Sequence, residues 1–198
     1  MAQTTASTPR AVSTARVREA LIDAALELFA RDGFDPTPTD RVAERAGVSS
    51  RTFFRYFPTK ESVVFHRDHG FMRSFAAAYV AQPRDLDDYD AVRATFVALA
   101  DGFGALRTRV ETYRAAVDSS PVLIGREQEQ LGAHAHTIAV AIAARHGVTA
   151  PRDEAYTLAS VSLALYQRAL RRWLDGPRSV ELASLLDDEF VRLRALVT

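Results

Sequence analysis

Apolar residues recur along most of the chain at the three- and four-residue spacing of an amphipathic helix. The first such stretch has apolar side chains at Val17, Leu21, Ala24, Leu28 and Phe29. No segment alternates between apolar and polar positions for long enough to indicate a sheet strand. The pattern therefore predicts an all-α protein, whose first helix begins at Ser13 or Thr14 and ends near Gly33.

Glycine, proline and short polar runs divide the rest of the chain into further helices. After Pro58, a long helix capped by Thr59 is expected to run toward Gln82 and Pro83. Beyond a polar stretch that ends near Asp90, the periodicity predicts helices over residues 89–107, 109–118, 122–146, 152–174 and 179–196.

The segment from Thr37 to Lys60 carries helix start and stop signals at close spacing. Thr37 is placed to cap a helix with Pro38 at its first position, where a missing N–H costs nothing. Gly47 suits the left-handed conformation that ends a helix, and Ser49 or Ser50 can cap the next one. The segment thus predicts two short helices joined by a tight turn, which is a helix-turn-helix.

The second short helix has two different faces at about 100° per residue. Phe53 and Phe57 share one face and are expected to be buried, whereas Arg51 and Arg55 share the opposite face. A helix that reads the DNA major groove needs such a basic face. An ordinary helical hairpin with a solvated basic face is the alternative that the periodicity alone leaves open.

Charge supports a local rather than a global DNA-binding surface. The 198 residues have a formal net charge of zero, with 25 Lys and Arg against 25 Asp and Glu. Between Arg41 and Lys60, however, five basic residues accompany one acid, Glu44. Any affinity for DNA must therefore come from this patch.

Several other classes of protein have little support in the sequence. There is no cysteine, and we find no apolar run that could span a bilayer and no signal segment, so a cytoplasmic protein without disulfides is expected. The pairs His66 with His69 and His134 with His136 could each contribute to a metal site, but further ligands are missing nearby. No catalytic motif and no cofactor-binding motif is found, so nothing in the sequence argues for an enzyme and none is expected.

The residues Val42–Ser49 and Thr52–Glu61 resemble the DNA-binding region of the TetR (tetracycline-repressor) family of bacterial transcriptional regulators. Ala24, Leu28, Phe29 and Gly33-Phe34 lie at the expected distance upstream. By matching positions, the resemblance implies base or groove contacts from Arg51, Thr52, Phe54 and Arg55. It implies backbone phosphate contacts from Thr39, Ser50, Tyr56 and Lys60.

The resemblance also implies a ligand pocket among the C-terminal helices and dimerisation through the last two. Candidate lining residues combine an apolar body with, in most cases, a polar tip: Phe103, Tyr113, His134, Tyr156, Tyr166 and Trp173. For each of them a plain core role is the alternative. Dimerisation has a physical reason as well, because two recognition helices one DNA turn apart read both halves of a palindrome.

We therefore expect a disordered tail over 1–12, a helix-turn-helix DNA-binding domain over 13–58, a connecting helix over 59–82 and a helical ligand-binding and dimerisation bundle over 83–198. The expected function is that of a homodimeric repressor that binds a palindromic double-stranded DNA operator. A small apolar or amphipathic effector would release it. In the alternative, the C-terminal bundle binds another protein and takes no small ligand.

Overall fold

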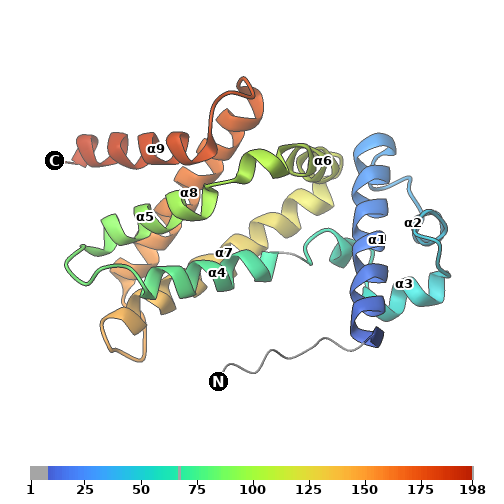
Figure 1. The fold of residues 1–198 in the computed structure, drawn as a ribbon, viewed down its shortest axis with the longest axis horizontal. Coiled ribbons are helices and arrows are strands. Elements are labelled where there is room, and N and C mark those ends of the chain that lie inside the picture. The colour runs from blue at the N-terminus through green and yellow to red at the C-terminus, as the bar shows by residue number, and fades with distance from the viewer. Residues whose placement is uncertain (1–8, 67, 198) are drawn as a thin grey trace. The chain divides into compact units, whose positions relative to one another are not determined.

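Helices and short connections make up the described part of the chain, residues 9–66 and 68–197, and no strand occurs among them in this computed structural model (Figure 1). The all-α prediction is confirmed. The chain divides into two units. The N-terminal unit takes the described residues up to His66 together with Thr112–Gly125, and the C-terminal unit takes the remainder. None of the described helices is long and apolar enough to cross a membrane.

The N-terminal unit is built on α1 (Pro9–Asp32), α2 (Thr39–Arg45), α3 (Ser50–Tyr56) and the 3-10 turn η1 (Glu61–Val63). Helix α1 begins four residues before the predicted start, with a proline in its first turn, where that residue is tolerated. Residues 9–12 of the predicted tail therefore belong to a helix, whereas residues 1–8 lie outside the described residues. Phe29, Phe53 and Phe57 are fully buried at the centre of this unit.

The predicted cap of α2 is wrong. Pro38 is the N-cap residue of α2 and makes no side-chain capping bond. The Thr37 side chain is completely buried, and its hydroxyl donates to the Gly33 carbonyl oxygen at 2.7 Å. Thr37 therefore closes the turn after α1, and its hydroxyl is directed away from the first amides of α2.

The continuous helix predicted over residues 59–82 is also wrong. The chain forms η1 and then, from Asp68, the separate helix α4 (Asp68–Val80). Thr59 and Ser62 satisfy each other's backbone groups, since each side-chain oxygen accepts from the other's amide at 3.3 Å. Three consecutive apolar residues, Val63 to Phe65, are then all buried, which one face of a regular helix cannot achieve.

A segment from the middle of the chain completes the N-terminal core. It consists of the end of α6 (Arg107–Asp118) and the start of α7 (Pro121–Arg145). Ala116, Val117 and Leu123 are fully buried in the same cluster as the helix-turn-helix. The Phe34 amide donates to the Ser119 hydroxyl at 3.0 Å, so a hydrogen bond as well as apolar packing joins the segment to the helix-turn-helix region.

The C-terminal unit contains α4, α5 (Asp88–Ala100), the 3-10 turn η2 (Phe103–Leu106), α8 (Asp153–Asp175), α9 (Leu182–Val197) and the rest of α6 and α7. Helix α9 packs on α5 and on α8, and α4 packs on α5. Its core contains Phe75, Phe96, Trp173 and Phe190, none of which is more than 1% exposed. The predicted boundaries of α7 and α8 are confirmed to within a residue.

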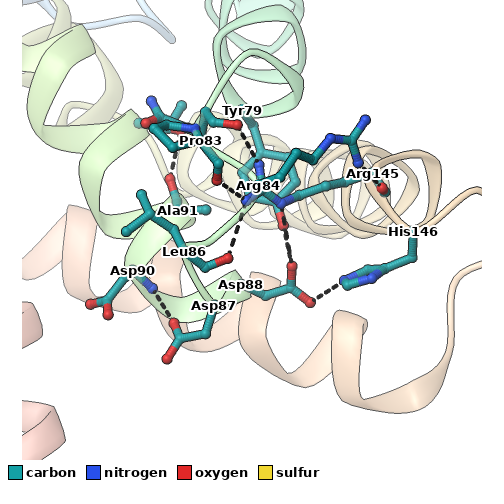
Figure 2. A network of polar contacts seen from close by, with 12 residues as sticks. Tyr79, Pro83, Arg84, Leu86, Asp87, Asp88, Asp90, Ala91, Arg145 and His146 are labelled. Atoms are coloured by element: carbon teal, nitrogen blue, oxygen red, sulfur yellow. Dashed lines mark hydrogen bonds and ion pairs between the residues drawn. The ribbon is translucent and has the colours of Figure 1, made fainter.

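The turn between α4 and α5 is held by a buried arginine from the end of α7 (Figure 2). The Arg145 guanidinium donates to the backbone carbonyls of Gln82, Pro83 and Leu86 and lies 5.5 Å from the centre of the Tyr79 ring. Asp88 accepts from the Tyr79 hydroxyl at 2.6 Å. Because its donors are used, the guanidinium can be buried without leaving unsatisfied N–H groups.

Candidate nucleic-acid interface

The turn between α2 and α3 has the geometry of a Schellman motif. The Val48 amide donates to the Ala43 carbonyl at 2.9 Å, and the Gly47 amide donates to the Glu44 carbonyl at 3.0 Å. Gly47 adopts a φ of +70°, which side-chain-bearing residues disfavour. The Ser49 hydroxyl then caps α3 by accepting from the Thr52 amide at 3.3 Å. These bonds fix the start of α3 at Ser50, after the turn that follows the end of α2 at Arg45.

The two faces of α3 lie as helical geometry predicted. Phe53 and Phe57 are 0% and 1% exposed, and their ring centroids are 5.8 Å apart in the core of the N-terminal unit. Arg51 and Arg55 are exposed on the other side of the helix. Phe54 is half exposed, with its ring edge against Phe53 at 5.3 Å.

Three of the remaining polar residues proposed for DNA contact, Thr39, Ser50 and Thr52, lie at the starts of the two helices. Thr39 is the first residue of α2 and Ser50 the first of α3, and both are half-buried. The Thr52 hydroxyl is 3.1 Å from the Ser49 hydroxyl. A hydroxyl so placed can still accept or donate one bond to a ligand, because each hydroxyl has both a donor and two lone pairs.

In the described part of the chain, the arginines of α2 form ion pairs with carboxylates, whereas those of α3 do not. Arg41 pairs with Asp32 at 2.9 Å, and Arg45 pairs with Glu27 at 2.9 Å, so α1 neutralises both. Within the described residues, Arg51 and Arg55 form no ion pair with any carboxylate. The positive charge of α3 is therefore uncompensated by protein acids, as a surface that meets a polyanion requires.

Lys60 lies against the protein rather than extending from it. Its ammonium donates to the carbonyls of Phe34 and Asp35 at 2.5 and 3.3 Å and is 4.2 Å from the Phe34 ring centroid. Burial lowers the pKa of this lysine, while the neighbouring carboxylates of Asp35 and Glu61 act in the opposite direction. The side chain thus joins the end of α3 to the turn between α1 and α2.

Two of the six candidate ligand residues meet in an aromatic cluster of the C-terminal unit. The Phe71 ring contacts both of them, with centroid distances of 6.4 Å to Phe103 and 5.7 Å to Tyr166. The Phe96 ring stacks on Tyr166 at a centroid distance of 5.6 Å. Phe71 and Phe96 are not among the six residues predicted from the sequence. Their only signal was an apolar position within a helical pattern, which core residues share.

The structure does not bring the other four candidates into this cluster. Trp173 is fully buried beneath Arg107, whose guanidinium is 5.1 Å from the ring and donates to the carbonyls that end α8. The Tyr156 hydroxyl is hydrogen-bonded to His136 Nδ1 at 2.8 Å, and His134 is half-buried on α7. Tyr113 packs in the N-terminal unit, so it belongs to a different core from the rest.

An open groove of about 300 Å³ lies between α5 and α9, away from every candidate residue. Its lining consists of Tyr89, Arg93, Phe190, Val191, Arg194 and Ala195. Both arginines are already paired with acids, Arg93 with Asp187 at 2.7 Å and Arg194 with Asp90 at 3.0 Å. The groove is therefore lined by apolar and aromatic side chains, and the charges of its two arginines are neutralised by these acids.

Among the described residues, no group of three or more His, Cys, Asp or Glu side chains is placed to hold a metal ion. His66 packs edge-on against the buried Phe57 ring at 5.5 Å. The side chain of His69 lies outside the described residues.

Comparison with known proteins gives matches to both parts of the chain. The family model described as "Bacterial regulatory proteins, tetR family" matches residues 21–66, and the model described as "MftR C-terminal domain" matches residues 86–198. The chain is 36% identical over 84 residues to the HTH-type transcriptional regulator TcmR of Streptomyces glaucescens, which is 42% of this chain and 37% of TcmR. The match thus spans little more than a third of that relative.

A second relative is matched over most of its length. The putative mycofactocin biosynthesis transcriptional regulator MftR of Mycobacterium tuberculosis is 27% identical over 161 residues, 75% of this chain and 77% of MftR. Among solved structures, a putative transcriptional regulator from Pseudomonas aeruginosa PAO1 superposes with a TM-score of 0.63 at 17% identity, covering 90% of this chain and 89% of that one. At this identity the structural match establishes the fold alone.

Proposed function

The chain belongs to the TetR family of bacterial regulatory proteins and is thus a DNA-binding transcriptional regulator, and from this premise we propose that it is an effector-released repressor. It would bind a palindromic operator as a homodimer, with the helix-turn-helix of the N-terminal unit reading DNA and the C-terminal unit serving effector binding and dimerisation. The family consists of regulators and not of enzymes.

The uncompensated arginines of α3 carry the proposal. Arg51 and Arg55 are exposed and have no carboxylate partner among the described residues, while the arginines of α2 are neutralised. In the proposed complex, Arg51, Thr52, Phe54 and Arg55 face the major groove. An arginine that forks onto a guanine is the commonest specific contact and is worth about 1–3 kcal/mol.

Dimerisation follows from how little DNA one α3 can reach. The helix has seven residues, so it spans only a few base pairs, too few for useful discrimination within a genome. Two copies related by a twofold axis would read both halves of a palindrome. Most apolar residues of α8 and α9 are buried within the C-terminal unit, but α9 leaves Val191 48% and Leu196 83% exposed, and these side chains would contribute to the contact.

The effector is proposed to enter the C-terminal unit at the aromatic cluster of Phe71, Phe96, Phe103 and Tyr166. A flat or chain-like apolar molecule could separate these rings while it kept contact with the Tyr166 hydroxyl end. Such a molecule can release DNA only if it binds the DNA-free conformation more tightly. Effector and operator must therefore weaken each other by the same factor.

One experiment tests the DNA-binding proposal directly. Genomic fragments retained by the purified protein are sequenced, and a shared palindrome is expected among them. Arg55→Ala should then lose the difference in affinity between this palindrome and a mixed-sequence duplex, because its base contact is gone. Unchanged operator affinity of Arg55→Ala in an electrophoretic shift assay would show that α3 uses another face.

A second candidate function for the C-terminal unit has its own support. The largest aromatic side chains of its core are fully buried, and the groove between α5 and α9 is open rather than enclosed. This packing suits a bundle that binds another protein through its surface. A screen of small apolar compounds by thermal unfolding separates the two functions, because an effector must raise the unfolding temperature.

A further inference from the structure

An arginine outside the helix-turn-helix shares the Tyr56 ring with Arg55. The guanidinium carbon of Arg18, on α1, lies 5.6 Å from the ring centroid of Tyr56, and that of Arg55 lies 5.3 Å from it. Both distances fall within the range of about 6 Å in which a cation is attracted to an aromatic ring. Tyr56 therefore gathers two positive charges at the C-terminal end of α3.

No acid balances these two charges in the described part of the chain. The Nε of Arg18 is buried, and it has no hydrogen-bond acceptor there either. The arginines of α2 differ, since each is paired with a carboxylate of α1. Like charges on one ring repel, so an anion bound at this corner would relieve that repulsion.

We propose that Arg18 contacts the DNA backbone and that Tyr56 acts through its ring, as the support that positions Arg18 and Arg55. The inference rests on the proposed function, because it requires α3 to lie in a groove. The phosphates beside that groove supply the missing anion. Contacts of this kind add affinity without regard to sequence and fix the register of the base-reading helix.

The first test measures binding to a mixed-sequence duplex over a range of salt concentrations, where affinity is electrostatic. Arg18→Gln keeps most of the side-chain length and removes the charge. It should weaken binding by roughly tenfold and reduce the slope of log affinity against log salt by about 0.9. The matched control Arg45→Gln removes a charge already neutralised by Glu27 and should leave the slope unchanged.

Two further variants separate the ring of Tyr56 from its hydroxyl. Tyr56→Phe keeps the support and should bind as the wild type does, whereas Tyr56→Leu should bind about as weakly as Arg18→Gln. Combining Tyr56→Leu with Arg18→Gln should add little, because both changes remove the same contact. A Tyr56→Phe variant as weak as Tyr56→Leu would assign the contact to the hydroxyl and overturn the inference.

Thermal unfolding of each variant without DNA shows whether stability explains the result. If Arg18→Gln only lowers the unfolding temperature and keeps the wild-type salt slope, Arg18 is a structural residue and the inference fails. Should the Arg18→Gln variant not fold, the inference is tested with Arg18→Lys and with the comparison of Tyr56→Phe and Tyr56→Leu. A wild-type protein that binds no duplex at all contradicts the proposed function itself.

Discussion

Lys60 matches a DNA-contact position of the family, and it also bonds the backbone of its own chain. Its ammonium holds the carbonyls of Phe34 and Asp35, so Lys60→Met should leave both without this donor. We expect the free energy of unfolding to fall by about 1–3 kcal/mol in urea titrations. The phosphate contact proposed from the family resemblance predicts a different result, in which stability is kept and the salt slope of DNA binding falls by about one.

Arg45→Met is the control for that comparison. It removes an exposed cation that pairs with Glu27 in solvent, and such a pair contributes at most about 1 kcal/mol. If Lys60→Met and Arg45→Met unfold at the same urea concentration, Lys60 does not support the turn.

Tyr79 should make the protein less stable at alkaline pH. Burial and the hydrogen bond to Asp88 raise the pKa of its hydroxyl well above the ordinary value of 10.0. Above that pH the unfolded chain loses the tyrosine proton while the folded protein keeps it. The free energy of unfolding should therefore decrease by up to about 1.4 kcal/mol per pH unit from this group.

The Tyr79→Phe variant isolates this effect, because the other tyrosines remain in both proteins. Its unfolding free energy should decline less steeply above pH 10.0 than that of the wild type. Parallel curves for the two proteins between about pH 9 and 11 would show that Tyr79 ionises equally in both states.

At the scale of elements, the turn between α2 and α3 depends on the backbone of Gly47. Its φ is +70°, yet a methyl group added there would meet no atom within 4 Å. Gly47→Ala should thus cost only the backbone strain, about 1–2 kcal/mol. Thermal unfolding measures it, with Gly125→Ala as the control: that glycine lies within α7 in open space, so alanine should stabilise the helix by up to about 1 kcal/mol.

Local signals explain which elements the sequence could predict. Gly47 and Ser49 act on their immediate neighbours, so the end of α2 and the start of α3 could be predicted from the residues themselves. The two faces of α3 followed as well, because helical geometry fixes them. The break after η1 could not be predicted, because burial of Val63, Val64 and Phe65 together depends on the core around them.

Contacts between distant parts of the chain were out of reach for the same reason. Tyr113 was grouped with the candidate ligand residues because its type suits a pocket, but it packs beside the helix-turn-helix. Arg18 carried no motif at all. Its position relative to Tyr56 is set by the core that α1 and α3 share, which no local spacing in the sequence records.

At the scale of the whole molecule, the DNA-binding unit depends on residues more than fifty positions downstream. Leu123 is fully buried in its core, so Leu123→Ala should destabilise that unit by about 2–5 kcal/mol. Amide hydrogen exchange should accelerate in α2 and α3. Leu182→Ala, equally buried in the other core, should leave exchange in these helices unchanged.

Equal exchange in α2 and α3 for the two variants would mean that the whole chain unfolds as one cooperative body. Faster exchange in the Leu123→Ala variant alone would mean that each unit opens separately, and that the segment Thr112–Gly125 belongs energetically to the DNA-binding unit.

The composition of that unit also limits how this regulator could be engineered. A chimaera that joined its first 66 residues to the effector-binding part of another regulator would replace Ala116, Val117 and Leu123 with foreign side chains. It would also exchange Ser119, whose hydroxyl accepts from the Phe34 amide. A chimaera that is meant to keep the DNA-binding unit intact must also include residues Thr112–Gly125. The transferable unit is therefore discontinuous in sequence.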